Sequence, residues 1–133
     1  MNMRYYVAVF DEAGDEMHLA LGLTPAFHDA HHTGTFDLEH HTHFLREVKV
    51  GEGVAVYARP VARSAKRLHY MMFLVNETSG ELSALFECVG SFVDLGTRRT
   101  APFPREIAAA IDAAIGRFAN LRWPAPVCGA MRA

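Results

Sequence analysis

The chain has 133 residues, and 50% of them are hydrophobic, which suits one globular domain with a sizeable core and argues against a disordered protein. Its formal net charge is -2 and its basic residues are scattered, so the sequence lacks the broad basic surface of a nucleic-acid-binding protein. Two cysteines are too few for a disulfide framework, and neither a signal sequence nor an apolar run of membrane length is apparent. We therefore expect a cytoplasmic protein with no nucleic-acid or membrane partner.

The first predicted element is a helix of roughly five turns over Asn2 to Leu21. Its apolar residues recur three and four positions apart and share one side: Tyr6, Val7, Phe10, Ala13, Gly14, Met17, Ala20 and Leu21. Asn2 can cap the first-turn amides, and Gly22 gives a stop. Because the next part of the chain reads as strands, this helix face has only a sheet to pack against.

Residues 26–34 show no strand period, and we expect them to form a mobile loop over the helix end. Four strands joined by tight turns are then predicted at Thr35–Val48, Val54–Arg63, Leu68–Val75 and Leu82–Leu95. Pro60 argues for an edge strand or a bulge, and Gly90 is the expected point of bending in the last strand. The third strand is nearly all apolar and should be buried on both faces.

A second amphipathic helix is expected after Pro104, with apolar residues at Ile107, Ile111, Ala114, Ile115 and Phe118. Residues 120–133 show no usable period and are expected to form a tail. The sequence thus predicts an α+β fold in which one antiparallel sheet packs on an N-terminal helix, with the domain covering residues 1–119.

The richest cluster of reactive side chains lies in the first predicted strand. Two-residue spacing places Glu39, His41 and His43 on one strand face. A carboxylate and an imidazole so placed can act as base and orienting group in hydrolysis, although such a face can also be merely solvated. A metal is a third possibility, with further ligands from His28, His31 or His32. No paired cysteines or HExxH motif supports it, so no metal is predicted.

Other candidates carry weaker signals. Two basic pairs stand at strand ends and could meet ligand phosphates or be ordinary turn residues: Lys66-Arg67 and Arg98-Arg99. Aromatic residues that could line a cleft for a quaternary ammonium group, or simply fill the core, are Tyr5, Tyr6, Phe10, Phe36 and Phe44. Cys88 has no neighbour suited to activating a thiolate and is expected to be buried and inert.

One long helix followed by four antiparallel strands resembles the hotdog fold, in which a curved antiparallel sheet wraps around a central helix. Residues 1–6 (MNMRYY) resemble the segment after Gly-His in the Asp-x-x-Gly-His-x-Asn pattern of acyl-CoA thioesterases of the hydroxybenzoyl-CoA thioesterase type. Residues 38–48 with Gly51-Glu52 are similar to the Glu-x-His strand of thioesterase domains associated with carnitine dehydrogenase. Residues 66–69 and 101–104 also resemble segments of that betainyl-CoA thioesterase-like subgroup.

The resemblance implies hydrolysis of a short CoA thioester, with betainyl-CoA as the subgroup's substrate and no cofactor. It assigns catalysis to Asn2, Glu39 and His41, with Glu39 as the leading general base. The expected substrate-binding residues are Tyr5, Tyr6, Phe36, Lys66 and Arg67.

Sites of this fold form between protomers, so a homodimer, or a tetramer built from it, is expected. The family's acidic residue, its Gly-His and its first strand would precede Met1. For that reason the alternative function is a non-catalytic hotdog module that binds an acyl-CoA or a small amine.

Overall fold

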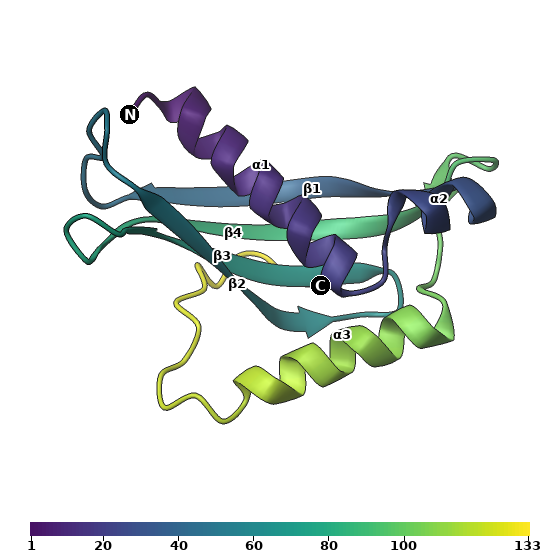
Figure 1. The fold of residues 1–133 in the computed structure, drawn as a ribbon. Coiled ribbons are helices and arrows are strands. Elements are labelled where there is room, and N and C mark those ends of the chain that lie inside the picture. The colour runs from purple at the N-terminus through teal and green to yellow at the C-terminus, as the bar shows by residue number, and fades with distance from the viewer.

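The computed structural model describes residues 1–133 and contains three helices and five strands. They are α1 (Met3–Ala20), α2 (Pro25–His31), β1 (Thr33–Phe44), β2 (Val54–Arg63), β3 (Arg67–Asn76), β4 (Glu81–Asp94), β5 (Arg99–Thr100) and α3 (Arg105–Phe118). Helix α1 lies diagonally across one face of the sheet, and α3 runs beside β2 (Figure 1). The predicted α+β class, with a helix on an antiparallel sheet, is confirmed.

The sheet has the order β1-β4-β3-β2, with antiparallel pairing throughout, and the short β5 adds to β4. Strands β1 and β2 are therefore the two edges. The predicted bounds of β2 are confirmed, and so is the interpretation of Pro60, because the β2–β3 register shifts between Pro60 and Ala62 on that edge strand. Strand β3 lies inside the sheet and is buried along most of its length, as its apolar sequence predicts.

The core forms where α1 meets the middle of the sheet. The predicted apolar stripe buries Tyr6, Phe10, Gly14 and Met17. Phe10 is fully buried and stacks on Phe86, with ring centroids 5.0 Å apart. Burying one such side chain contributes about 2 kcal/mol of hydrophobic free energy. This packing fixes which side of α1 remains free to line a cleft.

The ends of α1 match the predicted signals in part. Asn2 occupies the N-cap position, but its side chain makes no capping hydrogen bond, so the expected cap is wrong in that detail. Gly22 has a φ of 92°, a backbone conformation that favours glycine, and it turns the chain away after the helix.

The prediction of a mobile loop at residues 26–34 is wrong. The chain forms helix α2 there, because Thr24 caps it and Pro25 starts it. The Thr24 hydroxyl accepts a hydrogen bond from the Phe27 N–H at 3.0 Å. With only one cap and seven residues, α2 is too short to show a helical period in its sequence.

Strand β1 contains an irregularity that the alternation did not predict. Its register against β4 shifts between Asp37 and Glu39, so that Leu38 is the extra residue. Asp37 pairs with Gly90, whereas Glu39 pairs with Val89. The shift changes the phase of the strand, so Phe36 and His40 do not share the single face that simple alternation gives them.

The face of the sheet opposite α1, called here the outer face, carries the C-terminal tail, residues 120–133. Trp123 packs edge-on against Phe73 of β3, with centroids 5.4 Å apart, and Met131 is 4% exposed. In Figure 1 the tail leaves α3 and passes behind the sheet. No helix combines the length and apolarity needed to span a membrane.

Candidate active site

A cleft of about 430 Å³ lies between α1 and the edge strand β1. Its walls combine acidic, imidazole and apolar side chains: Val7, Phe10, Asp11, Gly14, Asp15, His18, Thr35, Asp37, Leu38, Glu39, His40, Tyr70, Met72 and Phe86. The apolar floor comes from core residues, whereas the polar groups come from the exposed sides of α1 and β1. A concave site that combines apolar walls with a few polar groups is the usual form of a small-ligand site.

The helix side of the cleft was missed in the sequence. Asp11, Asp15 and His18 are spaced four and three apart, which places them on one side of α1, next to its buried stripe. That spacing was the available signal, but alone it is equally typical of a solvated helix face. Burial lowers the pKa of His18, against the opposing influence of Asp37 and Asp15. The imidazole is therefore neutral near pH 7 and can accept or donate a hydrogen bond.

A buried polar network supports the strand side of the cleft. The Tyr70 hydroxyl donates to Oδ1 of Asp37 at 3.3 Å, and Tyr70 itself is only 2% exposed. Burial raises the pKa of Tyr70, with Cys88 and Asp37 adding to the shift, so the phenol stays protonated and acts as a donor. Burial also raises the pKa of Cys88 to about 12, which agrees with the expected inert thiol.

The predicted catalytic residues are not gathered within one protomer. Glu39 is exposed and lines the cleft, level with the middle of β1. Asn2 lies at the other end of that strand, because neighbouring Tyr6 packs edge-on against Phe44 at 5.1 Å and donates to the Arg46 carbonyl at 3.1 Å. Five residues of strand span roughly 17 Å. Glu39 and Asn2 therefore do not meet unless a second copy contributes one of them.

His41 stands apart from the cleft. It pairs with Glu87, which points to the outer face, and its Nε2 lies 3.0 Å from Nε2 of His43. The alternation predicted for Glu39, His41 and His43 is kept in the register, which pairs them with Val89, Glu87 and Leu85. Glu39, next to the bulge, also borders the cleft, whereas α1 does not cover His41 and His43. His41 therefore does not line the cleft of its own protomer, and its predicted catalytic role stays a prediction. His40, whose ring lies 5.0 Å from that of Phe86, is the histidine of β1 that faces the cleft.

The aromatic residues predicted to bind the substrate are also dispersed. Tyr6 is buried, and Tyr5 is exposed beneath the Arg4 guanidinium, 4.6 Å from its ring centroid. Phe36 is 61% exposed at the opposite end of β1. Their predicted roles in substrate binding stay predictions.

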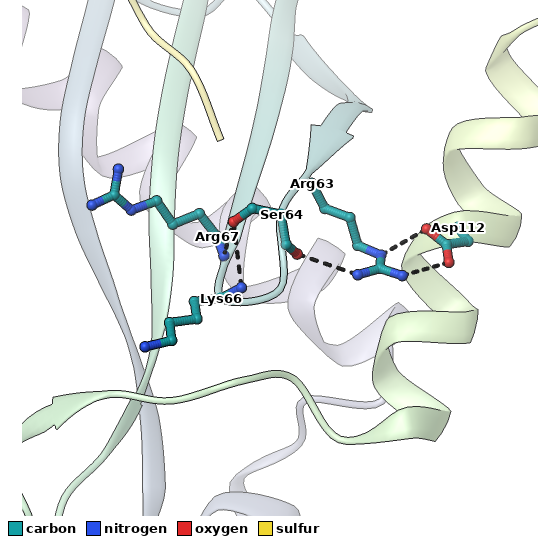
Figure 2. Close-up of polar contacts among 5 residues, drawn as sticks. All are labelled: Arg63, Ser64, Lys66, Arg67 and Asp112. Carbon is teal, nitrogen blue, oxygen red and sulfur yellow. Dashed lines mark hydrogen bonds and ion pairs between the residues drawn. The ribbon is translucent and has the colours of Figure 1, made fainter.

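In the predicted basic turn, Lys66-Arg67, hydrogen bonds hold the backbone, whereas the two side chains form no ion pair. The Lys66 and Arg67 amides both donate to Oγ of Ser64, at 3.3 and 3.1 Å. Figure 2 shows both side chains extending away from the ion pair that Arg63 forms with Asp112 of α3. Across the sheet Arg67 pairs with Ser91, which pairs with Phe36, so the turn stands level with the Phe36 end of β1.

A helix laid across an antiparallel sheet, with a cleft between them at a free sheet edge, is the architecture of the hotdog fold. The chain belongs to the Thioesterase-like superfamily, whose family model matches residues 1–111. Both findings confirm the predicted resemblance.

Known relatives agree with this assignment. The chain is 37% identical over 109 residues to a betainyl-CoA thioesterase of Pseudomonas aeruginosa, covering 82% of this chain and 69% of that protein. It is 24% identical over 124 residues to an L-carnitine dehydrogenase/betainyl-CoA thioesterase of Rhizobium meliloti, covering 93% of this chain but 25% of that longer protein. Among solved structures, a Staphylococcus aureus protein in complex with CoA has a TM-score of 0.87 at 25% identity, covering 93% of this chain and 78% of that one.

Proposed function

We propose that this protein hydrolyses a CoA thioester whose acyl group carries a quaternary ammonium, with betainyl-CoA as the best-fitting substrate. Membership of the thioesterase superfamily gives the reaction class. The observation that carries the substrate class is the composition of the cleft, whose lining includes Asp11, Asp15 and Asp37 together with Phe10 and Phe86. The similarity to a betainyl-CoA thioesterase supports the same acyl group.

Carboxylates beside aromatic rings are complementary to this particular cation. A trimethylammonium group has no N–H to donate, so it is recognised by negative charge and by the electron-rich faces of aromatic rings. Tyr70 holds Asp37 toward the cleft through its hydroxyl. The acyl group is therefore expected to lie between α1 and β1, with its charge near Asp37 and Asp15.

In the reaction, water attacks the thioester carbonyl carbon, the carbon–sulfur bond breaks, CoA leaves as the thiol and the acyl group leaves as a carboxylate. Glu39, which lines the cleft, takes the proton from the water as general base. The start of α1 at Asn2 stabilises the oxyanion, because first-turn N–H groups have no partner within the helix and the helix dipole favours negative charge there. This mechanism does not use His41.

We infer that these two groups meet across a homodimer. The start of α1 lies over Phe44, at one end of β1, and the cleft lies toward the other end. Antiparallel pairing of two β1 edges about a two-fold axis near His41 sets Glu39 of one copy opposite His43 of the other, next to Phe44, and so brings the helix start of one copy beside the cleft of the other. Tetramer formation and a cytoplasmic location stay predictions.

The CoA portion has a candidate partner in the basic turn. Lys66 and Arg67 extend as unpaired cations from a turn whose backbone is held by Ser64 (Figure 2). Phosphate groups are favoured partners of such side chains. We expect them to contact the CoA phosphates and to affect KM more than kcat.

The test compares two substrates of equal shape. Betainyl-CoA and its tert-butylacetyl-CoA isostere differ in one atom, a cationic nitrogen in the first and a neutral carbon in the second, and thiol release reports hydrolysis of both. We expect kcat/KM to favour betainyl-CoA about tenfold or more, and Asp37→Asn to reduce that ratio, because a desolvated cation–π or charge contact contributes about 1–2 kcal/mol. Equal hydrolysis of both substrates would contradict the substrate class, and binding without thiol release would favour the non-catalytic module.

A further inference from the structure

The outer face of the sheet carries a second hollow, on the opposite side of the sheet from the cleft and independent of the proposed function. It has a volume of about 230 Å³ and lies between the sheet and the C-terminal tail. Its lining residues are His41, His43, Met71, Leu85, Glu87, Pro126, Val127 and Cys128. Unlike the cleft, it contains no residue of α1, and it gathers four groups that bind transition metals.

The potential ligand atoms converge from three separate segments. His41 and His43 alternate on β1, and their Nε2 atoms lie 3.0 Å apart. Glu87 of β4 stands directly opposite His41 in the antiparallel register. One ligand atom each from His41, Glu87 and Cys128 lies within 4.8 Å of the others.

Both carboxylate oxygens of buried Glu87 accept hydrogen bonds, which orient the side chain. Oε1 accepts a hydrogen bond from Nε2 of His69 at 2.7 Å, and Oε2 accepts one from the Cys128 N–H at 2.7 Å. Glu87 is 3% exposed and His69 is 5% exposed, so both are removed from bulk water. These two hydrogen bonds fix the orientation of the carboxylate beside His41 and Cys128. A carboxylate held by an outer hydrogen-bond partner is the usual support of a metal ligand.

The cysteine is also presented as a ligand. Cys128 is exposed and its backbone is tied to Glu87, which fixes its position over the sheet. Its Sγ accepts a hydrogen bond from the Ala130 N–H at 3.4 Å. The thiolate is the form of a cysteine that binds metals.

We propose that the outer face carries a zinc site whose ligands are His41, His43, Glu87 and Cys128. Two imidazoles, a carboxylate and a thiolate form the mixed nitrogen, oxygen and sulfur set that tetrahedral zinc accepts. Zinc bound at about 2.0 Å holds two nitrogens about 3.3 Å apart, close to the spacing of the two imidazoles. The site fastens the C-terminal tail to β1 and β4, and its role is structural because the cleft lies on the other face.

The experiment uses the full chain without an affinity tag, stripped with a chelator and titrated with zinc chloride in a calorimeter. We expect about one equivalent to bind and the melting temperature to rise, because a ligand that binds only the folded state stabilises it. Cobalt in place of zinc should give a thiolate-to-cobalt charge-transfer absorption band. Binding of less than a tenth of an equivalent would overturn the proposal.

Three variants sharpen the result. Cys128→Ser should abolish the cobalt–thiolate band and weaken zinc binding at least tenfold, and His69→Gln should weaken it ten- to a hundredfold through Glu87 alone. His31→Gln removes an exposed histidine of α2 and should leave zinc binding unchanged. Unchanged zinc affinity in Cys128→Ser, or an equal loss in His31→Gln, would place the metal elsewhere and overturn the assignment. Thioester hydrolysis by Cys128→Ser should match the parent, which separates this site from the cleft.

Discussion

At the scale of single residues, Glu39 carries the largest expected effect. Glu39→Gln keeps the size of the side chain but removes its basicity, so kcat for betainyl-CoA should fall on the order of a hundredfold or more. Assays of thiol release at saturating betainyl-CoA would measure this change in kcat. Glu77→Gln, an exposed glutamate in the turn between β3 and β4, is the matched control and should keep the parent rate. A Glu39→Gln protein as fast as the parent would remove the proposed base.

His18 gives the protein a pH-dependent stability. Burial lowers the pKa of His18 in the folded state below its ordinary value of 6.5, although Asp37 and Asp15 oppose the shift and His28 adds to it. The unfolded chain therefore binds a proton that the folded chain resists. The stabilising contribution is complete above pH 6.5 and is lost as pH falls through the lower folded pKa.

His18→Gln should therefore flatten the acid side of the stability profile. The urea concentration at the midpoint of unfolding should differ less between about pH 7.5 and about pH 5 in the variant than in the parent. His28, whose pKa burial also lowers, contributes in the same direction and leaves a residual slope. An unchanged difference between the two midpoints would show that His18 is not the group responsible.

At the scale of elements, α2 depends on its cap. Thr24→Ala removes the side-chain acceptor for the Phe27 N–H, and the loss of such a cap costs about 1 kcal/mol. Thr24→Ser retains the hydroxyl and should stay close to the parent. Urea unfolding of the three proteins measures the difference, and equal midpoints for the alanine and serine variants would contradict a capping role.

The elements also show what the sequence could and could not predict. Helical spacing located α1 and α3, and turn residues with β-branched runs located β2 to its end residues, because these signals are local. The bulge at Leu38 was out of reach, since register depends on the partner strand. Gly90, which lies opposite Asp37, allows the close packing beside the bulge, because a Cβ at residue 90 would approach Oδ1 of Asp37 to 3.0 Å. The bulge therefore shifts the register between Asp37 and Glu39 in a way that no local pattern records, although both residues line the cleft.

Some residues of the candidate site have a local sequence signal, and others do not. Glu39 could be found from its spacing, because β1 was recognised as a strand. The cleft's acidic side chains on α1 could not, since Asp11 and Asp15 look like any solvated helix face until the position of β1 is known. The donation from Tyr70 to Asp37 joins residues of β3 and β1, which are not neighbours in the sheet.

At the scale of the whole molecule, the sheet separates two kinds of chemistry. The face toward α1 holds the acidic, aromatic cleft, whereas the outer face holds the imidazole and thiol groups beneath the tail. Residues adjacent in sequence, such as His40 and His41, belong to opposite faces. The histidines of β1 are therefore divided between the two faces of the sheet.

The free edge of β1 is expected to pair with a second copy of the chain. It exposes backbone hydrogen-bonding groups together with apolar side chains, among them Leu38 at 49% and Phe44 at 50% exposure. Light scattering at micromolar concentration should give twice the 14.7 kDa mass of one chain. Leu38→Lys places like charges near a two-fold axis, so it should weaken the dimer at least tenfold and reduce hydrolysis with it, because each cleft then loses the helix start of its partner. Val50→Lys, which adds the same charge at a fully exposed turn residue, should leave mass and rate unchanged. A parent protein that remains at the mass of one chain would contradict both the dimer and the shared site.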